Sequence, residues 1–193
     1  MQPINDVSEL FRHQRAVRAF SDRPVDGETI EAVLTAATHA PSGSNTQPWR
    51  FVVVRDAAVK SALSTEYEAA FADAYADRAP ARASDRQPWA EVPVLIVACV
   101  TVPRTGRTGI QTGASIYPAC QNLMLAARSL GLGSVLTTLH RVRRARIHEI
   151  LGIPEGWDTA AIIPLGWPTR SYGPNHRRPA SEVTMYDRWS DEA

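Results

Sequence analysis

The side chains best suited to chemistry gather in one short polar segment, residues 40–49, which reads Ala-Pro-Ser-Gly-Ser-Asn-Thr-Gln-Pro-Trp. Pro41 ends the preceding helix, because proline cannot continue one, and Gly43 permits backbone angles that other residues avoid. Hydroxyl and amide groups both donate and accept hydrogen bonds, and four residues supply them: Ser42, Ser44, Asn45 and Gln47. Such a loop suits an uncharged ligand with many hydrogen-bonding groups, such as a sugar-alcohol chain or a heteroaromatic edge.

Ser, Asn, Gly and Pro also dominate ordinary turns, so composition alone leaves a simple connector as the alternative. The order of the residues resembles the signature of the FMN-dependent nitroreductase family, Pro-Ser-Gly-x-Asn-x-Gln-Pro-Trp before the first core strand. The chain matches it at Pro41, Ser42, Gly43, Asn45, Gln47, Pro48 and Trp49. The resemblance implies that this loop binds FMN through Pro41, Ser42, Ser44, Asn45 and Gln47.

A second candidate is the basic segment at residues 14–18, Gln-Arg-Ala-Val-Arg. A guanidinium presents a planar fork that grips phosphate at two points, although two arginines alone are more typical of a solvated turn. The segment resembles the family's Arg-Arg-Ser-x-Arg-x-Phe motif, which Phe20 closes. The resemblance places Arg15 and Ala16 at the FMN phosphate and ribityl chain and Arg18 at the flavin pyrimidine. Gln14 stands where the first Arg is expected and Ala16 where Ser is expected, which weakens the phosphate contact.

The C-terminal segment carries a basic cluster, His176-Arg177-Arg178-Pro179. Alone it is typical of a disordered basic tail. The resemblance implies that Arg178 returns to the FMN phosphate, with His176 or Arg177 as its companion.

The run from Gly131 to Thr138 contains Gly-x-Gly, but the third glycine of a dinucleotide fingerprint is missing and the motif precedes a strand, so a Rossmann site is excluded. Gly131 is instead predicted to cap a helix. The resemblance implies that the loop after the short strand lies at flavin N5, where a backbone N–H donates to that atom. The residues of this neighbourhood are Leu136, Thr137 and Thr138.

Capping residues and hydrophobic periodicity predict five helices, over residues 5–14, from Asp26 to before Pro41, from Asp56 through Ala74, and over 112–130 and 141–151. Apolar runs predict strands at residues 50–54, 93–100, 134–138 and 159–166, with Pro164 at a bulge or a sheet edge. Strands that alternate with helices favour an α/β or α+β sandwich. The resemblance implies a nitroreductase-like fold, a central mixed sheet flanked by helices in an intertwined homodimer.

The chain of 193 residues fits one domain over residues 1–193. The helix at 112–130 is apolar nearly all round, so we expect it in a core or a subunit interface. The extended tail at 167–193 is too long to be held by its own subunit alone. Both features predict a homodimer in which the partner receives the tail.

Composition excludes several function classes. The net charge of +1 gives no global field for nucleic acid or membrane, and no apolar stretch is long enough to span a bilayer. The basic run at 141–146 lacks interleaved aromatics and is predicted to be a solvated helix face. Cys99 and Cys120 sit in apolar surroundings without ligand spacing, so we interpret both as buried thiols in a reducing compartment, with a cytoplasmic location and no metal site.

Taken together, the resemblance implies an oxidoreductase that passes hydride from NAD(P)H through flavin N5 to a nitroaromatic, quinone or similar oxidised small molecule. The flavin carries the chemistry, so no catalytic side chain is expected. One alternative is a dimer that binds or sequesters flavin with little turnover. Another is a different reaction of the same fold: reductive dehalogenation, enone reduction or breakdown of the flavin.

Overall fold

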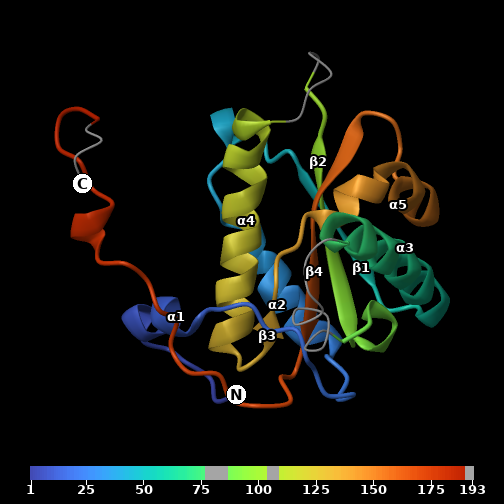
Figure 1. Ribbon diagram of the computed structural model, residues 1–193, viewed down its shortest axis with the longest axis horizontal. Coiled ribbons are helices and arrows are strands. Elements are labelled where there is room, and N and C mark those ends of the chain that lie inside the picture. The colour runs from blue at the N-terminus through green and yellow to red at the C-terminus, as the bar shows by residue number, and fades with distance from the viewer. Residues whose placement is uncertain (77–86, 104–108, 190–193) are drawn as a thin grey trace.

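A single four-stranded sheet forms the centre of the molecule (Figure 1). The computed structural model describes residues 1–76, 87–103 and 109–189. The strands run in the order β1-β2-β4-β3. Their bounds are Trp49–Val54 for β1, Val94–Thr101 for β2, Gly133–Ser134 for β3 and Trp157–Gly166 for β4.

All three strand pairs are antiparallel, which corrects the mixed sheet predicted from the sequence. Among the described residues, parallel pairing is limited to one isolated bridge between Ala16 and Ser134. The prediction went wrong because alternating helices and strands do not fix strand direction. A connecting helix can return the chain to either end of the sheet.

The described part of the chain contains five α-helices, of which α1 packs on α4 and the other four lie against the sheet. They are α1 Val7–His13, α2 Gly27–Thr38, α3 Ala57–Tyr75, α4 Ile110–Ser129 and α5 Arg144–Leu151. The first three begin at aspartate caps, where the carboxylates of Asp6, Asp26 and Asp56 accept a backbone N–H at 2.7–2.9 Å. The predicted helix at 141–151 starts instead as the 3-10 helix η4, Leu139–Arg143, and becomes α-helical at Arg144.

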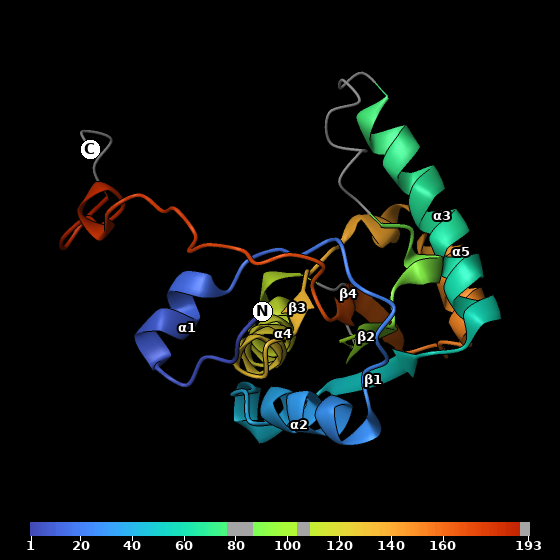
Figure 2. The same cartoon turned by 90° about the horizontal axis from the view of Figure 1, so that it is seen from below.

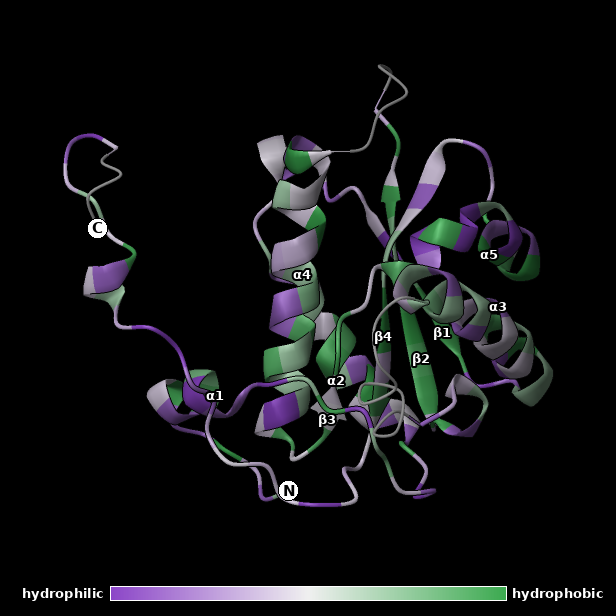
Figure 3. Cartoon of the chain, in the orientation of Figure 1, coloured by the Kyte–Doolittle hydropathy of each residue, from purple (hydrophilic) through white to green (hydrophobic). Residues whose placement is uncertain are grey.

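The helices cover the sheet from both sides (Figure 2). Helices α2 and α4 pack against Ile96 and Ala98 on one face of β2, whereas α3 and α5 pack against Leu95 and Val97 on the other. Strand β2 is therefore buried on both faces, as its unbroken apolar sequence predicts, and it is green along most of its length in Figure 3. This three-layer arrangement confirms the α+β sandwich.

Pro164 lies inside the sheet rather than at an edge, because β4 is flanked by β2 and β3. The ladder irregularity falls elsewhere, where Ala98 pairs with Ala161 and Cys99 with Thr159. The Pro164 carbonyl accepts from Val135 N at 3.4 Å, so its nitrogen faces the same side. Because proline has no N–H to donate back, the β3–β4 ladder breaks at this pair and resumes in the same register as the isolated bridge between Thr137 and Ile162. This explains why the strand predicted over 134–138 is only two residues long.

Helix α4 is not buried all round within one chain. Its inner face is buried against the sheet and α2, but Ala114, Tyr117 and Gln121 are exposed. The tail beyond β4 reaches away from the body (Figures 1 and 2) and contains one short 3-10 helix among its described residues, η5 Ala180–Glu182. Tyr186 and Trp189 are 83% and 80% exposed at its end.

Candidate functional site

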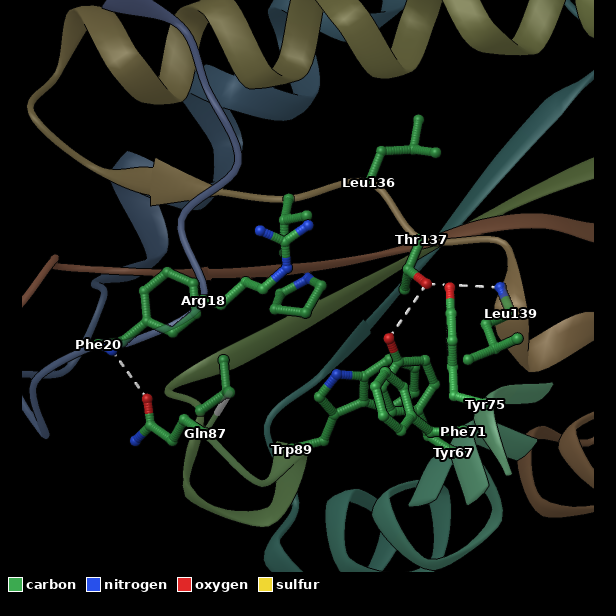
Figure 4. Close-up of a pocket in the computed structure, with 13 residues that line it drawn as sticks. Arg18, Phe20, Tyr67, Phe71, Tyr75, Gln87, Trp89, Leu136, Thr137 and Leu139 are labelled. Atoms are coloured by element: carbon green, nitrogen blue, oxygen red, sulfur yellow. Dashed lines mark hydrogen bonds between the residues drawn. The ribbon is translucent and has the colours of Figure 1, made fainter. Parts of the chain in front are cut away.

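A cavity of about 420 Å³ opens between α3, the 3-10 helix η3 (Trp89–Glu91) and the chain that follows β3. Figure 4 shows Arg18 and the Leu136–Thr137 turn on one side of it and a group of aromatic rings on the other. The rings belong to Tyr67, Phe71, Tyr75 and Trp89. The volume lies in the usual range for small-molecule sites, about 300–1,000 Å³.

Arg18 reaches the cavity because its segment lies directly against β3. Val17 N donates to Ser134 O at 3.0 Å, and the Val17 side chain is buried. A Cβ on Gly133 would stand 2.7 Å from Val17 Cγ1, so only glycine allows this approach. Since neighbouring side chains of an extended segment point to opposite sides, burial of Val17 turns Arg18 outward to the cavity.

The turn after β3 supplies a backbone donor at the cavity wall. Thr137 pairs with Ile162 through two hydrogen bonds of 3.0 Å, and its hydroxyl lies 3.3 Å from the Tyr67 hydroxyl. Among the described residues, nothing accepts a hydrogen bond from Leu136 N. Thr138 does not line the cavity; it is exposed, and its carbonyl accepts from Arg141 N at 3.0 Å.

The aromatic wall was missed as a site by sequence reasoning. Tyr67 and Trp89 are buried and stacked 3.9 Å apart at 16°, and both rings also line the cavity. The signal was present in the spacing: Tyr67, Phe71 and Tyr75 recur every four residues and so share one helix face.

The polar loop at residues 41–48 lies at a different place. Gly43 N donates to Ser115 Oγ at 3.4 Å, near the start of α4, whereas the basic segment contacts β3, just beyond the end of the same helix. Helix α4 has 20 residues, which corresponds to about 30 Å. None of the five predicted loop residues lines the cavity, so one chain alone does not bring loop and cavity together.

Backbone strain is concentrated in this loop. Ser44, Asn45 and Gln47 have φ of 50°, 52° and 48°, a left-handed region that non-glycine residues seldom adopt. The sequence analysis assigned the unusual angle to Gly43, but Gly43 is not among the positive-φ residues. Each strained residue costs about 1–3 kcal/mol, and such residues cluster at functional sites. The loop is therefore more than a connector of lowest energy.

The basic tail begins beside the basic segment. Asn175 Nδ2 donates to Gln14 O at 3.1 Å, and Arg15 Nη1 donates to Gly173 O at 3.4 Å. Ala16 is exposed and forms the bridge to Ser134. His176 and Arg178 follow the anchored residues directly and are exposed. The structure thus brings Arg15 to the base of the tail and leaves the two predicted tail residues open to solvent.

The remaining reactive groups are engaged or neutral. Burial raises the pKa of Cys99 to about 11 and of Cys120 to about 12, so neither is a ready nucleophile. The four arginines between 141 and 146 all pair with carboxylates, those of Asp158, Asp73, Glu66 and Glu149. This pairing fits the predicted helix face rather than a nucleic-acid surface.

A sequence model of the Nitroreductase family matches residues 11–167, which is most of the chain. The chain belongs to the nitroreductase family. A protein of Archaeoglobus fulgidus named NADH dehydrogenase/NAD(P)H nitroreductase is 32% identical over 86% of this chain and 87% of its own length. An iodotyrosine deiodinase of Haliscomenobacter hydrossis is 30% identical over 83% of this chain and 78% of its own.

The nitroreductase fold is confirmed by solved structures. An iodotyrosine deiodinase, solved with FMN and 3-iodo-L-tyrosine, superposes with a TM-score of 0.80 at 24% identity. The match covers 94% of this nitroreductase-family chain and 99% of that one. Within the described residues of this chain, no helix combines the length and hydropathy required to cross a bilayer.

Proposed function

We propose that this nitroreductase-family protein is an FMN-dependent oxidoreductase that uses NAD(P)H to reduce a nitroaromatic, a quinone or a similar oxidised small molecule. The observation that carries the proposal is the cavity between Arg18, the free N–H of Leu136 and a wall of aromatic rings. A planar heteroaromatic ring with electronegative edges fits these three elements. The name of the Archaeoglobus fulgidus relative supports NAD(P)H as the electron donor.

The donor set of the cavity matches the isoalloxazine of FMN. Arg18 brings a positive charge that suits the pyrimidine oxygen and nitrogen, and Leu136 N–H suits N5. FMN, when bound, supplies hydride acceptance and donation at N5. The protein's own contribution is to bind, orient and exclude water. Arg15 and the tail residues His176 and Arg178 would hold the phosphate.

A second copy of the chain would complete the site. The polar loop that resembles the flavin signature stands away from the cavity of its own chain, and it is exposed and strained. The outer face of α4 and the tail with Tyr186 and Trp189 are also uncovered. In a homodimer, α4 would pack on its counterpart, the tail would cross to the partner, and the loop of one chain would meet the cavity of the other.

The direct test is the absorption spectrum of the purified protein under anaerobic conditions, before and after NADH or NADPH. A bound flavin that either nucleotide bleaches, and that a nitroaromatic or quinone recolours, is the expected result. A yellow protein that no nicotinamide bleaches would favour the flavin-sequestering alternative. A colourless monomer that ignores added FMN would contradict the proposal.

Reductive dehalogenation is the second candidate, because iodotyrosine deiodinase is among the relatives at 30% identity. The aromatic wall could equally stack on a halogenated phenol. Release of iodide from 3-iodo-L-tyrosine by the reduced protein would favour this reaction. Turnover of a nitroaromatic or quinone without iodide release would favour the first.

A further inference from the structure

The extended segment that brings Arg18 to the cavity is fixed along one edge by a residue far away in the sequence, Gln87. Gln87 N donates to Arg18 O at 3.1 Å, and Gln87 Oε1 accepts from Phe20 N at 2.8 Å. Figure 4 shows the second of these bonds close to the Arg18 side chain. Because the carbonyl of one residue and the N–H of the second residue after it point to the same side of an extended chain, this one glutamine takes the place of a neighbouring strand.

The opposite edge of the segment is bonded to the rest of the fold. Val17 N donates to a carbonyl of β3 at 3.0 Å, and Ala19 O accepts from Thr169 N at 3.3 Å. These bonds engage the residues on either side of Arg18 and place the segment between β3 and the start of the tail. The carbonyl of Arg18 itself accepts from Gln87, which also lines the cavity. Gln87 therefore provides the contacts of this segment on the cavity side.

Gln87 is in turn connected to the aromatic wall of the cavity. Its Nε2 donates to Glu91 O at 3.4 Å, at the end of the short helix η3. Two residues after Gln87, the buried Trp89 stacks on Tyr67 of α3 with ring centroids 3.9 Å apart. A continuous set of contacts thus runs from α3 through Gln87 to the backbone on both sides of the Arg18 side chain.

We propose that Gln87 is a positioning residue for Arg18. Its two bonds fix the peptide groups between Arg18 and Phe20, so the guanidinium extends from a backbone that is held in place before any ligand binds. A pre-organised group loses less conformational freedom when it contacts a ligand, and this raises affinity. The effect on FMN rests on the proposed function, whereas the effect on the Phe20 amide does not. The two can therefore be tested separately.

The first experiment measures hydrogen exchange of the Phe20 amide in full-length, flavin-free protein labelled with ¹⁵N-phenylalanine. Gln87→Met removes the acceptor at similar side-chain length, whereas Gln87→Glu keeps an acceptor. We expect exchange to be about ten-fold faster than in the parent for Met and within about two-fold of the parent for Glu, as loss of one hydrogen bond implies. The amide of Phe71, inside α3, is the internal reference. Equal exchange of the Phe20 amide in all three proteins would overturn the proposal, whether or not the protein binds FMN.

The second experiment compares FMN dissociation constants, measured by flavin fluorescence, for Gln87→Met in two backgrounds: the parent and Arg18→Ala. Gln87→Met should weaken FMN about five-fold in the parent, as loss of one neutral hydrogen bond does, but less than about two-fold once Arg18 has been replaced. Such non-additivity identifies a residue that acts through another one. Gln2→Met is the matched control, at an exposed glutamine outside the cavity lining, and should bind FMN as the parent does.

An equal loss of FMN affinity in both backgrounds would contradict the positioning role. Thermal unfolding without FMN then shows whether Gln87 supports the fold in general, which lowers stability in step, or contacts the flavin itself, which does not. Unchanged affinity in the parent background would also contradict the proposal. If the parent binds no FMN, the proposed function fails together with the part of this proposal that concerns FMN, and the Phe20 amide decides whether Gln87 fixes the segment.

Discussion

The polar loop at residues 40–49 and the wall of the cavity differ in almost every physical respect. Residues 41 and 43–47 of the loop are exposed, three of them have strained backbone angles, and the order of the residues matches a family signature. The cavity wall is built from Arg18, one backbone N–H and aromatic rings that the sequence motifs did not single out. The comparison teaches that the most recognisable motif need not sit in a visible pocket. In the proposed homodimer, the loop of one chain would reach the cavity of the other.

Removal of the cavity's charge should have the largest effect. Arg18→Ala is expected to weaken FMN about 10- to 100-fold, since a charged hydrogen bond contributes about 1.5–3 kcal/mol. Binding can be followed by flavin fluorescence, with Arg55→Ala, an exposed arginine outside the cavity lining, as the control. An equal change in both variants would mean that only net charge matters, and the cavity would lose its role.

Close approach of the basic segment to β3 can be tested with Gly133→Ala. The new methyl group would stand 2.7 Å from Val17 Cγ1 and 2.9 Å from Pro168 Cγ. Overpacking of this kind costs about 1–3 kcal/mol, so urea unfolding should shift to lower concentration and FMN binding should weaken. Gly27→Ala, at a site with open space, is the control. Equal stability of Gly133→Ala and the parent would show that Val17 leaves room for a methyl group at position 133.

The buried His140 predicts that the stability of the folded chain depends on pH. Its pKa is lowered to about 4, whereas the unfolded chain titrates near 6.5. As pH falls from 6.5 toward 4, His140 is therefore protonated in the unfolded state but not in the folded state. The free energy of unfolding decreases as a result. Urea unfolding should lose about 2 kcal/mol between pH 7 and 4.5. His140→Gln should lack this part of the slope; an unchanged slope would assign it to other groups.

Relief of strain in the loop should have the smallest effect. Ser44→Gly places glycine at φ 50° and should stabilise the chain by about 0.5–1 kcal/mol, while it weakens FMN binding by loss of the hydroxyl. Thr46→Gly, at φ −71°, is the matched control and should destabilise. The measurement is thermal unfolding of both variants without FMN. If Ser44→Gly does not stabilise the chain, Ser44 is not strained in the loop.

Local chemistry made much of the fold predictable. Asp26 and Asp56 begin helices because each carboxylate accepts a hydrogen bond from a free N–H in the first turn of its helix. Gly131 follows the end of α4 with φ of 88°, as its predicted capping role requires. The apolar run of β2 also predicted its burial. These features depend on a few neighbouring residues, so a single sequence contains enough information for them.

Other features depend on contacts between distant segments. Strand direction, the inner position of Pro164 and the early end of β3 follow from how β4 meets its neighbours. Trp89 joins the cavity because it stacks on Tyr67, which no local pattern reveals. The loop motif resembled a flavin site, but its separation from the cavity along α4 appears only in three dimensions.

The central claim is that one chain's cavity and the other chain's loop form each flavin site, and mixing two defective variants tests it most directly. Arg18→Ala and Asn45→Ala homodimers should each bind FMN weakly, because every site lacks one group. After unfolding and refolding together, about half of the dimers should be mixed, each with one intact and one doubly defective site. About a quarter of all sites should then regain parental affinity. The control is the double variant Arg18→Ala with Asn45→Ala, unfolded and refolded in the same way, in which every site lacks both groups. No recovery of FMN affinity in the mixture, or equal recovery in the double variant, would contradict the account.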